Sequence, residues 1–191
     1  MLKIGVLALQ GGVEEHINAF RSLAVDAREI RLPDELEGLQ GLVIPGGESM
    51  AIANLMDSFG LREPIKECVK QGMGVWGTCA GLILIANEVD GGCPTPLCLV
   101  DIRVTRNAFG RQVDSFAAEL SVPVLGDKTF HAVFIRAPVI QQVKNDAKVL
   151  ANLPDGRVIA VMQEKVLGTA FHPELTQDLR FHQYFLDIVT S

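Results

Sequence analysis

The sequence predicts an α/β fold, a three-layer, doubly wound and mostly parallel sheet with added strands in its C-terminal half. Up to about residue 88, short apolar runs alternate with segments of helical periodicity, which is the pattern of β-α units. After residue 98, short strand-like segments follow one another between turns. With 191 residues, 48% of them hydrophobic, the chain is long enough for one well-packed domain and short for two. We therefore expect a single domain over residues 1–191.

The N-terminal half is expected to supply the parallel strands and most of the helices. Most of its strand segments are continuously apolar, as strands buried on both faces are. The expected strands are residues 2–9, 25–31, 41–45 and 73–77. The first helix is predicted from Val13, Ile17, Phe20 and Ala24, which recur at helical spacing, and further helices are expected at residues 49–59, 62–71 and 80–88.

The C-terminal half has a different sequence pattern, with short strand-like segments between turns. Residues 89–98 are expected to form a loop, because they contain two glycines and two prolines. Short strands are then predicted at residues 99–106, 116–124, 131–136, 148–153, 157–163 and 166–171. A last helix is predicted at about residues 177–190, with Phe181, Phe185, Ile188 and Val189 on one side.

Composition and charge argue against several functional classes. The net charge is −6, and the lysines and arginines are scattered, so no basic stripe indicates a nucleic-acid partner and no basic amphipathic helix indicates a membrane surface. No segment approaches the roughly 20 apolar residues that span a bilayer. The first apolar run ends in Gln10-Gly11-Gly12 and is too short for a signal sequence with a cleavage site. We expect a soluble, cytoplasmic protein.

The cysteines do not predict a disulfide framework or a metal site. The chain contains Cys68, Cys79, Cys93 and Cys98. Four cysteines in a chain of this length without a secretion signal are typical of reduced thiols. Cys93 and Cys98 lack a second metal-like pair and a nearby histidine, so we expect no zinc site.

Three predicted strand ends carry unusual residues, namely 10–12, 45–49 and 77–81. In a doubly wound sheet, ligands bind beyond the carboxyl ends of the strands. All three loops are therefore expected to face one crevice.

The segment Gly77-Thr78-Cys79-Ala80-Gly81 fits the nucleophile-elbow pattern, with cysteine in place of serine. In such an elbow the nucleophile has a strained backbone, and the residues two before and two after it approach closely, which favours glycine. The N-terminus of the following helix favours a thiolate, and the N–H of Ala80 would point to a developing oxyanion. The alternative is a buried core cysteine beside glycines that pack helices.

A thiol nucleophile needs a base and a group that orients the base. Residue His172 precedes Pro173, which favours extended backbone, and in an extended chain the side chains of His172 and Glu174 share a face. Glu174 would then fix the tautomer of the imidazole. The alternative is an ordinary turn after a strand.

The other histidines are weaker candidates. We expect His16 and His182, which lie in helical patterns, to be solvated or packed, and His131 has no acidic neighbour within two residues.

The turn Pro45-Gly46-Gly47 is the third part of the predicted site. Glycines let backbone N–H groups approach a ligand, so Gly47 is a candidate for the second oxyanion donor. A plain turn between a strand and a helix is the alternative. We predict a site because the elbow thiol, the His-x-Glu pair and the glycine turn occur together, each at a strand end.

These motifs resemble the class I glutamine amidotransferases of the triad type. The segments GTCAG, FHPE and PGGES carry the resemblance to that superfamily. RNAFGRQ and FIRAP make the sequence more similar to the glutaminase subunits of pyridoxal 5′-phosphate synthases. The resemblance extends over nearly the whole chain, and it implies a class I glutamine amidotransferase-like fold.

The resemblance also implies a mechanism and a set of site residues. Cys79 would attack the side-chain amide of L-glutamine, His172 would protonate the departing ammonia and then activate water, and Glu174 would hold His172. Activity would then fall in acid as His172 becomes protonated. The backbone N–H groups of Gly47 and Ala80 would form the oxyanion hole, with Gln10 as a helper. The implied substrate contacts are Gly47, Glu48, Ser49, Arg106, Ile135 and Arg136.

A partner follows from the same resemblance. The ammonia would pass to a separate synthase subunit in a hetero-oligomer, and docking would reorganise the loop at Gly46-Gly47. Pyridoxal phosphate would be the product of the complex, and we expect no cofactor and no metal bound to this chain. The alternatives are an amidotransferase subunit for another pathway, a cysteine hydrolase on a similar fold, and a non-catalytic regulatory subunit.

Overall fold

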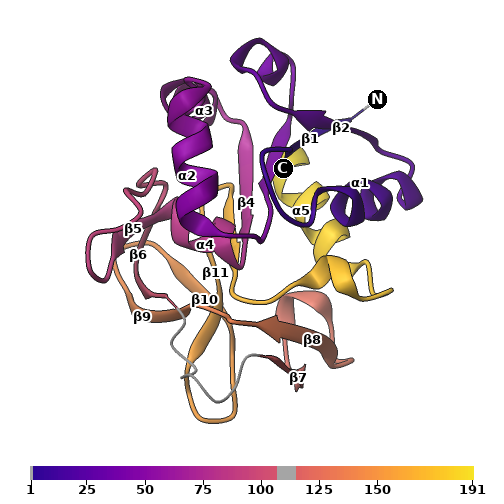
Figure 1. Cartoon of the computed structure of the whole chain (residues 1–191). Coiled ribbons are helices and arrows are strands. Elements are labelled where there is room, and N and C mark those ends of the chain that lie inside the picture. Colours follow the sequence, from indigo (N-terminus) through magenta and orange to yellow (C-terminus); the bar gives the residue numbers. More distant parts are fainter. Residues whose placement is uncertain (1, 107–114) are drawn as a thin grey trace.

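The computed structural model describes residues 2–106 and 115–191 and shows a twisted central sheet with helices on both of its faces (Figure 1). The strand order along the sheet is β2-β1-β3-β4-β12-β11-β9-β6-β5, and β10 pairs with β11 outside this path. The three-layer α/β architecture predicted from the sequence is confirmed.

The first five strands of this order run parallel to one another. They are β2 (Asp26–Ile30), β1 (Lys3–Leu7), β3 (Gly41–Ile44), β4 (Gly74–Thr78) and β12 (Val166–Thr169). Every residue of β3, β4 and β12 is buried, which explains why the first two are continuous apolar runs in the sequence. Their carboxyl ends carry the loops of the predicted site.

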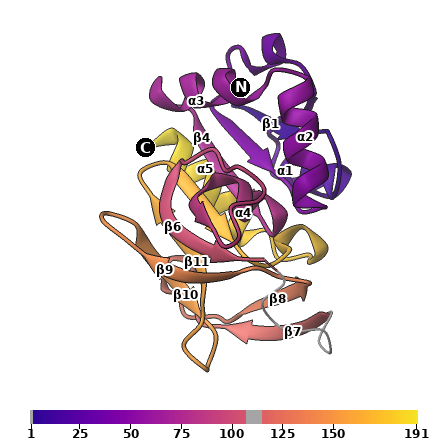
Figure 2. The same cartoon turned by 60° about the vertical axis from the view of Figure 1, so that its left-hand side comes forward.

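Two helices cover one face of the parallel part, α1 (Val13–Ser22) and α5 (Arg180–Thr190) (Figures 1 and 2). Phe185 of α5 stacks obliquely on Trp76 of β4, with 5.6 Å between ring centroids. The opposite face is covered by α2 (Ser49–Ser58) and the short helix α4 (Ala80–Ile85), and α3 (Arg62–Lys70) follows α2. Both layers bury apolar side chains against the sheet and so form one continuous core.

The remaining strands form the added C-terminal part. The sheet continues through β11 (Val158–Gln163), β9 (Val139–Val143), β6 (Val100–Thr105), β5 (Ala86–Val89) and β10 (Lys148–Asn152), mostly by antiparallel pairing. Strands β7 (Ser115–Leu120) and β8 (Phe130–Ile135) pair antiparallel as a separate two-stranded sheet. This small sheet lies at the lower edge of the molecule in both views (Figures 1 and 2). Three 3₁₀ turns complete the fold, η1 (Pro33–Leu36), η2 (Pro123–Leu125) and η3 (Pro173–Leu175).

The structure differs locally from the sequence prediction, and the strand predicted at 116–124 ends at Leu120 before the turn η2. The helix predicted at 80–88 ends at Ile85, and residues 86–89 form strand β5, in which Asn87 and Glu88 are exposed between two buried ends. Strand β9 was not predicted, because its exposed Gln141 and Gln142 interrupt the apolar pattern. The last helix begins at Arg180, because the side chains of Thr176 and Asp178 bond backbone N–H groups in a turn before it.

Within residues 2–106 and 115–191, the helices are all too short or too polar to cross a lipid bilayer.

Candidate active site

Cys79 lies at a sharp turn between β4 and α4, with backbone angles φ 48° and ψ −103°. A non-glycine residue rarely adopts a positive φ, so this backbone is strained. A Cβ at Gly77 would lie 2.5 Å from the Gly81 carbonyl oxygen, and a Cβ at Gly81 would lie 1.9 Å from the Ile44 carbonyl oxygen. The two glycines that flank the cysteine are therefore required by contact with backbone, as the elbow pattern predicts.

The Cys79 side chain is buried close to the ends of two other strands, β3 and β8. Its Sγ lies 3.7 Å from the Ile135 carbonyl oxygen at the end of β8. A Cβ at Gly46 would come within 3.2 Å of the Cys79 Cβ and 2.4 Å of the His172 Cε1. The elbow, the glycine turn and His172 therefore meet at one point, although they are far apart in the sequence.

His172 and Glu174 form the pair expected from their spacing. His172 Nδ1 lies 2.7 Å from Glu174 Oε1, and the Glu174 side chain is only 1% exposed. The His172 backbone N–H donates to the Val133 carbonyl oxygen of β8 over 2.8 Å, which fixes the segment where η3 begins. The carboxylate therefore holds the Nδ1 side of the ring.

The electrostatics of the pair favour a protonated imidazole. Burial lowers the pKa of His172, but side-chain hydrogen bonds and the negative charges of Cys79 and Glu174 outweigh it and raise the pKa to about 10. Burial raises the pKa of the Glu174 carboxyl, yet the His16 and His172 rings bring the net shift below the ordinary value. The imidazole thus carries the proton at neutral pH. The expected protonation of His172 only in acid does not fit this raised pKa, while the expected pH dependence of activity stays a prediction.

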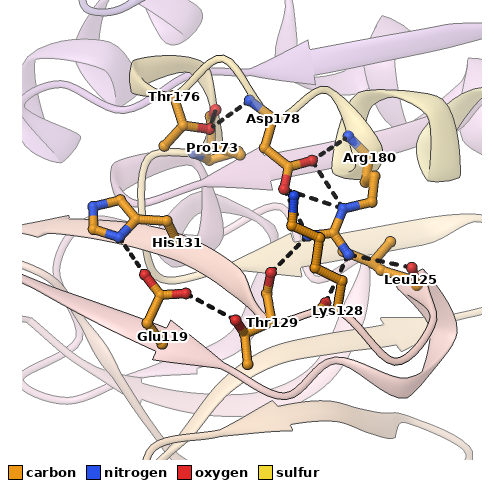
Figure 3. Close-up of polar contacts among 9 residues, drawn as sticks. All are labelled: Glu119, Leu125, Lys128, Thr129, His131, Pro173, Thr176, Asp178 and Arg180. Atoms are coloured by element: carbon orange, nitrogen blue, oxygen red, sulfur yellow. Dashed lines mark hydrogen bonds and ion pairs between the residues drawn. The ribbon is translucent and has the colours of Figure 1, made fainter.

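The segment after Glu174 is anchored by a second network (Figure 3). Thr176 Oγ1 donates to the Pro173 carbonyl oxygen over 3.1 Å. The Arg180 guanidinium bonds the Asp178 carboxylate and also donates to the carbonyl oxygens of Lys128 and Thr129, each over 2.7 Å. The network therefore connects the turn that carries His172 and Glu174 to the loop before β8.

The loop at residues 45–49 is held by contacts from two neighbouring segments. The Gly46 carbonyl oxygen accepts from the Gly12 N–H over 3.1 Å, and the Gly46 N–H donates to Thr78 Oγ1 over 3.1 Å. The Glu48 N–H donates to Gln10 Oε1 over 2.6 Å. Gln10 therefore uses its carbonyl oxygen to fix the loop, which leaves its NH₂ group as the donor.

Charged groups lie at the other side of the cavity. The Glu48 carboxylate caps α2 by accepting from the N–H groups of Met50 and Ala51, and it lies 3.4 Å from the Arg106 guanidinium. These backbone hydrogen bonds, Met50 first, together with the charges of Arg106 and Arg136, lower the pKa of the Glu48 carboxyl against the opposing effect of burial. Glu48 is therefore ionised at neutral pH, next to cationic side chains.

All the predicted site residues border one cavity of about 370 Å³, a volume suited to a small molecule. They are Gln10, Gly47, Glu48, Ser49, Cys79, Ala80, Arg106, Ile135, Arg136, His172 and Glu174. Residues 107–112 of the segment RNAFGRQ lie outside the described residues. The structure brings the predicted residues together, and their roles stay predictions.

Sequence reasoning missed other residues near the site. Glu15 and Leu175 also line the cavity. His16 is completely buried and lies 3.4 Å from Glu174 Oε2, although the sequence only indicated a packed or solvated helical histidine. The helical spacing of the α1 residues could place His16 on the buried face, but it could not identify the carboxylate 158 positions later as a neighbour.

Comparisons with known proteins match the chain to a family and to a solved fold. The model of the SNO glutamine amidotransferase family matches residues 6–191. The pyridoxal 5′-phosphate synthase subunit PdxT of Moorella thermoacetica is 50% identical over 188 residues, which cover 98% of this chain and 100% of that protein. The same subunit of a Dehalococcoides mccartyi strain is 53% identical over 190 residues, covering 98% and 97%. A crystal structure described as a glutamine amidotransferase superimposes with a TM-score of 0.92 and 44% identity, covering 98% and 99%.

Proposed function

Because this chain belongs to the SNO glutamine amidotransferase family, we propose that it is the glutaminase subunit of a pyridoxal 5′-phosphate synthase. It hydrolyses L-glutamine to glutamate and ammonia. The observation that carries the proposal is the set of Cys79, His172 and Glu174 at one cavity. The thiol occupies a strained elbow, and the His172 ring bonds Glu174 and has its pKa raised by Cys79.

The first half of the reaction uses the proton that His172 holds. The Cys79 thiolate attacks the amide carbon of glutamine, and the negative charge moves to the amide oxygen. The N–H groups of Gly47 and Ala80 and the NH₂ group of Gln10 receive this oxyanion. The His172 Nε2–H then protonates the amide nitrogen, the C–N bond breaks, and ammonia leaves a glutamyl thioester on Cys79.

The second half restores the starting state. The neutral His172 takes a proton from a water molecule, and the resulting hydroxide attacks the thioester carbon. The C–S bond breaks, glutamate leaves, and the thiolate and the imidazolium are regenerated. Glu174 accepts from the Nδ1–H of His172 throughout, so it keeps Nε2 directed at the reacting atoms.

Charge complementarity supports L-glutamine as the substrate. The Glu48 carboxylate suits the α-ammonium group, and Arg106 and Arg136 suit the α-carboxylate. The Ser49 hydroxyl and the Ile135 backbone complete the implied contacts. The distance between this charged side of the cavity and the thiol then selects the length of the substrate side chain whose amide reaches Cys79.

The ammonia has a consumer in the proposed complex. The relatives are named as subunits of pyridoxal 5′-phosphate synthase, so a separate synthase subunit is the proposed partner and pyridoxal phosphate is its product, made in the cytoplasm.

The direct test is glutamine hydrolysis with and without the synthase subunit. Cys79→Ala is expected to reduce kcat by at least about 10³-fold, because the nucleophile is lost. The matched control is Cys98→Ala, which removes an exposed thiol outside the cavity and is expected to keep wild-type activity.

Three results would overturn or narrow the proposal. Full activity of the Cys79→Ala protein would exclude a thioester mechanism. Mass spectrometry after treatment with a glutamine-like electrophile would favour a non-catalytic subunit if Cys79 stayed unlabelled. Activation by the synthase subunit of another amidotransferase, and not by pyridoxal phosphate synthase, would assign a different pathway.

A further inference from the structure

A buried polar cluster, defined as His16, Thr78 and His182, lies beneath the proposed triad on the α1/α5 side of the sheet. All three side chains have 0% exposure. His16 comes from α1, Thr78 from the end of β4, and His182 from α5. The reaction steps above use none of them. Buried polar groups in an apolar layer are costly unless they are hydrogen-bonded, so their arrangement needs a reason.

The contacts of His16 connect the cluster to the triad. Its Nε2 lies 3.3 Å from Thr78 Oγ1 and 3.4 Å from Glu174 Oε2. Its Nδ1 lies 3.1 Å from His182 Nε2. Trp76 packs edge-on against both imidazole rings and keeps the cluster dry.

Glu174 depends on this cluster for one of its two oxygens. Oε1 bonds His172, whereas Oε2 is buried and has no hydrogen bond of good geometry among the described residues. The ring nitrogen Nε2 of His16 faces this oxygen at a distance of 3.4 Å. An N–H at this position stabilises the carboxylate, while a bare nitrogen lone pair would repel it.

The tautomers follow from the same contacts. With a hydrogen on His16 Nε2, the His16 Nδ1 accepts from the Nε2–H of His182, and the unpartnered His182 Nδ1 is a bare acceptor. The opposite arrangement would turn a lone pair toward Glu174 and would bury the His182 Nδ1–H without an acceptor. The first tautomer arrangement has the lower free energy, because a buried N–H without an acceptor is rarer in proteins than a buried acceptor without a donor.

Both rings are held in the neutral state. Burial lowers the pKa of His16 against the raising effect of Glu174, and burial followed by the neighbouring His16 lowers the pKa of His182 to about 2. The cluster therefore acts through oriented N–H dipoles, directed from His182 through His16 toward Glu174.

We propose that His16 is a positioning residue for the reaction, because its Nε2–H fixes the Glu174 carboxylate that orients His172. Thr78 extends the effect to the loop at residues 45–49, since its Oγ1 contacts His16 and accepts from the Gly46 N–H. One buried ring thus supports both the acid–base pair and the loop beside the thiol. The inference rests on the proposed glutaminase function and deepens it.

The test compares kcat and KM of the wild type, His16→Leu and His16→Gln in complex with the synthase subunit. His16→Leu removes both ring nitrogens and is expected to lower kcat about 10–100-fold with KM within about twofold, because the loss acts on the chemical step. Glutamine again offers one donor and one acceptor, so His16→Gln is expected to recover kcat to within about threefold of the wild type. Circular dichroism checks that each variant is folded.

The matched control is His131→Leu. His131 Nδ1 lies 2.6 Å from Glu119 Oε1 on the exposed two-stranded sheet, so it is also a histidine paired with a glutamate (Figure 3). Its loss is expected to leave kcat unchanged. A folded His16→Leu protein with wild-type kcat would overturn the inference while leaving the proposed function intact, and so would a His16→Gln protein no better than His16→Leu. A wild type that never hydrolyses glutamine would instead overturn the proposed function.

A second measurement is independent of activity and of the folding of any variant. The ring ¹⁵N chemical shifts of the wild type at pH 7.5 are expected to show His16 and His182 protonated on Nε2 only. Protonation of His16 on Nδ1 alone would overturn the inference, because Glu174 would then face a lone pair.

Discussion

The molecule contains two histidine–glutamate pairs with almost the same geometry and very different surroundings. His172 and Glu174 are 2.7 Å apart, with side chains 12% and 1% exposed. His131 and Glu119 are 2.6 Å apart, with side chains 56% and 57% exposed. The first pair follows strand β12 of the parallel sheet. The second pair, drawn in Figure 3, lies on the two-stranded sheet.

The difference shows that distance alone does not make a reactive pair. Around His172, burial removes the screening by water, and Cys79 supplies a second negative partner that raises the pKa of His172 to about 10. Water screens the charges of the exposed pair, and neither His131 nor Glu119 lines the cavity that holds Cys79. The pair at the cavity therefore differs by its third partner and by its burial.

The largest expected difference between the two pairs is the effect on kcat of replacing the glutamate of each. Glu174→Gln should lower kcat about 10²–10⁴-fold, because the imidazolium loses the charge that orients and stabilises it. Glu119→Gln should leave kcat unchanged. Steady-state glutaminase assays with the synthase subunit give both values. Equal losses in the two variants would show that burial and the third partner do not distinguish the pairs.

A smaller effect is expected on acid stability, and it comes from the buried cluster beneath the triad. Folded His182 stays neutral down to about pH 2, whereas in the unfolded chain it takes up a proton near its ordinary value of 6.5. The unfolded state therefore binds more protons below pH 6.5, and the free energy of unfolding falls as pH decreases. His182 alone contributes a slope of about 1.4 kcal/mol per pH unit, or roughly 2 kcal/mol between pH 6.5 and 5, and His16 adds in the same direction.

Urea unfolding between pH 5 and 7.5 measures this slope in the wild type and in two variants. His182→Phe should reduce the slope, since one of the two buried rings is gone and an aromatic ring still fills the site, while His16 keeps its own contribution. The exposed His131→Leu variant should retain the slope. A His182→Phe protein with the wild-type slope would contradict the assigned neutral state.

The sequence predicted the parts of the site that depend on short spacing. Gly77, Cys79 and Gly81 lie two residues apart, and the steric need for glycine is local to the turn. His172 and Glu174 are also two residues apart, so extended backbone brings them together. The buried parallel strands were predictable as well, because burial on both faces leaves a continuous apolar run.

Contacts across elements could not be predicted in the same way. Glu119 reaches His131 only through the register of β7 and β8, and the sequence search for acidic neighbours within two residues missed it. His16 meets Glu174 only after α1 packs on the sheet. The single domain over residues 1–191 stays a prediction. The chemical roles of the site residues also stay predictions, since packing geometry alone does not measure reactivity.

The most direct test of the central claim is the titration of the His172 ring by NMR in the wild type and in Cys79→Ala. We expect a pKa of about 10 in the wild type, because Cys79 and Glu174 together outweigh the effect of burial. We expect a clearly lower pKa in Cys79→Ala, where one of these two partners is absent. A ring that titrates near 6.5 in both proteins would contradict the electrostatic coupling of His172 to Cys79 and Glu174.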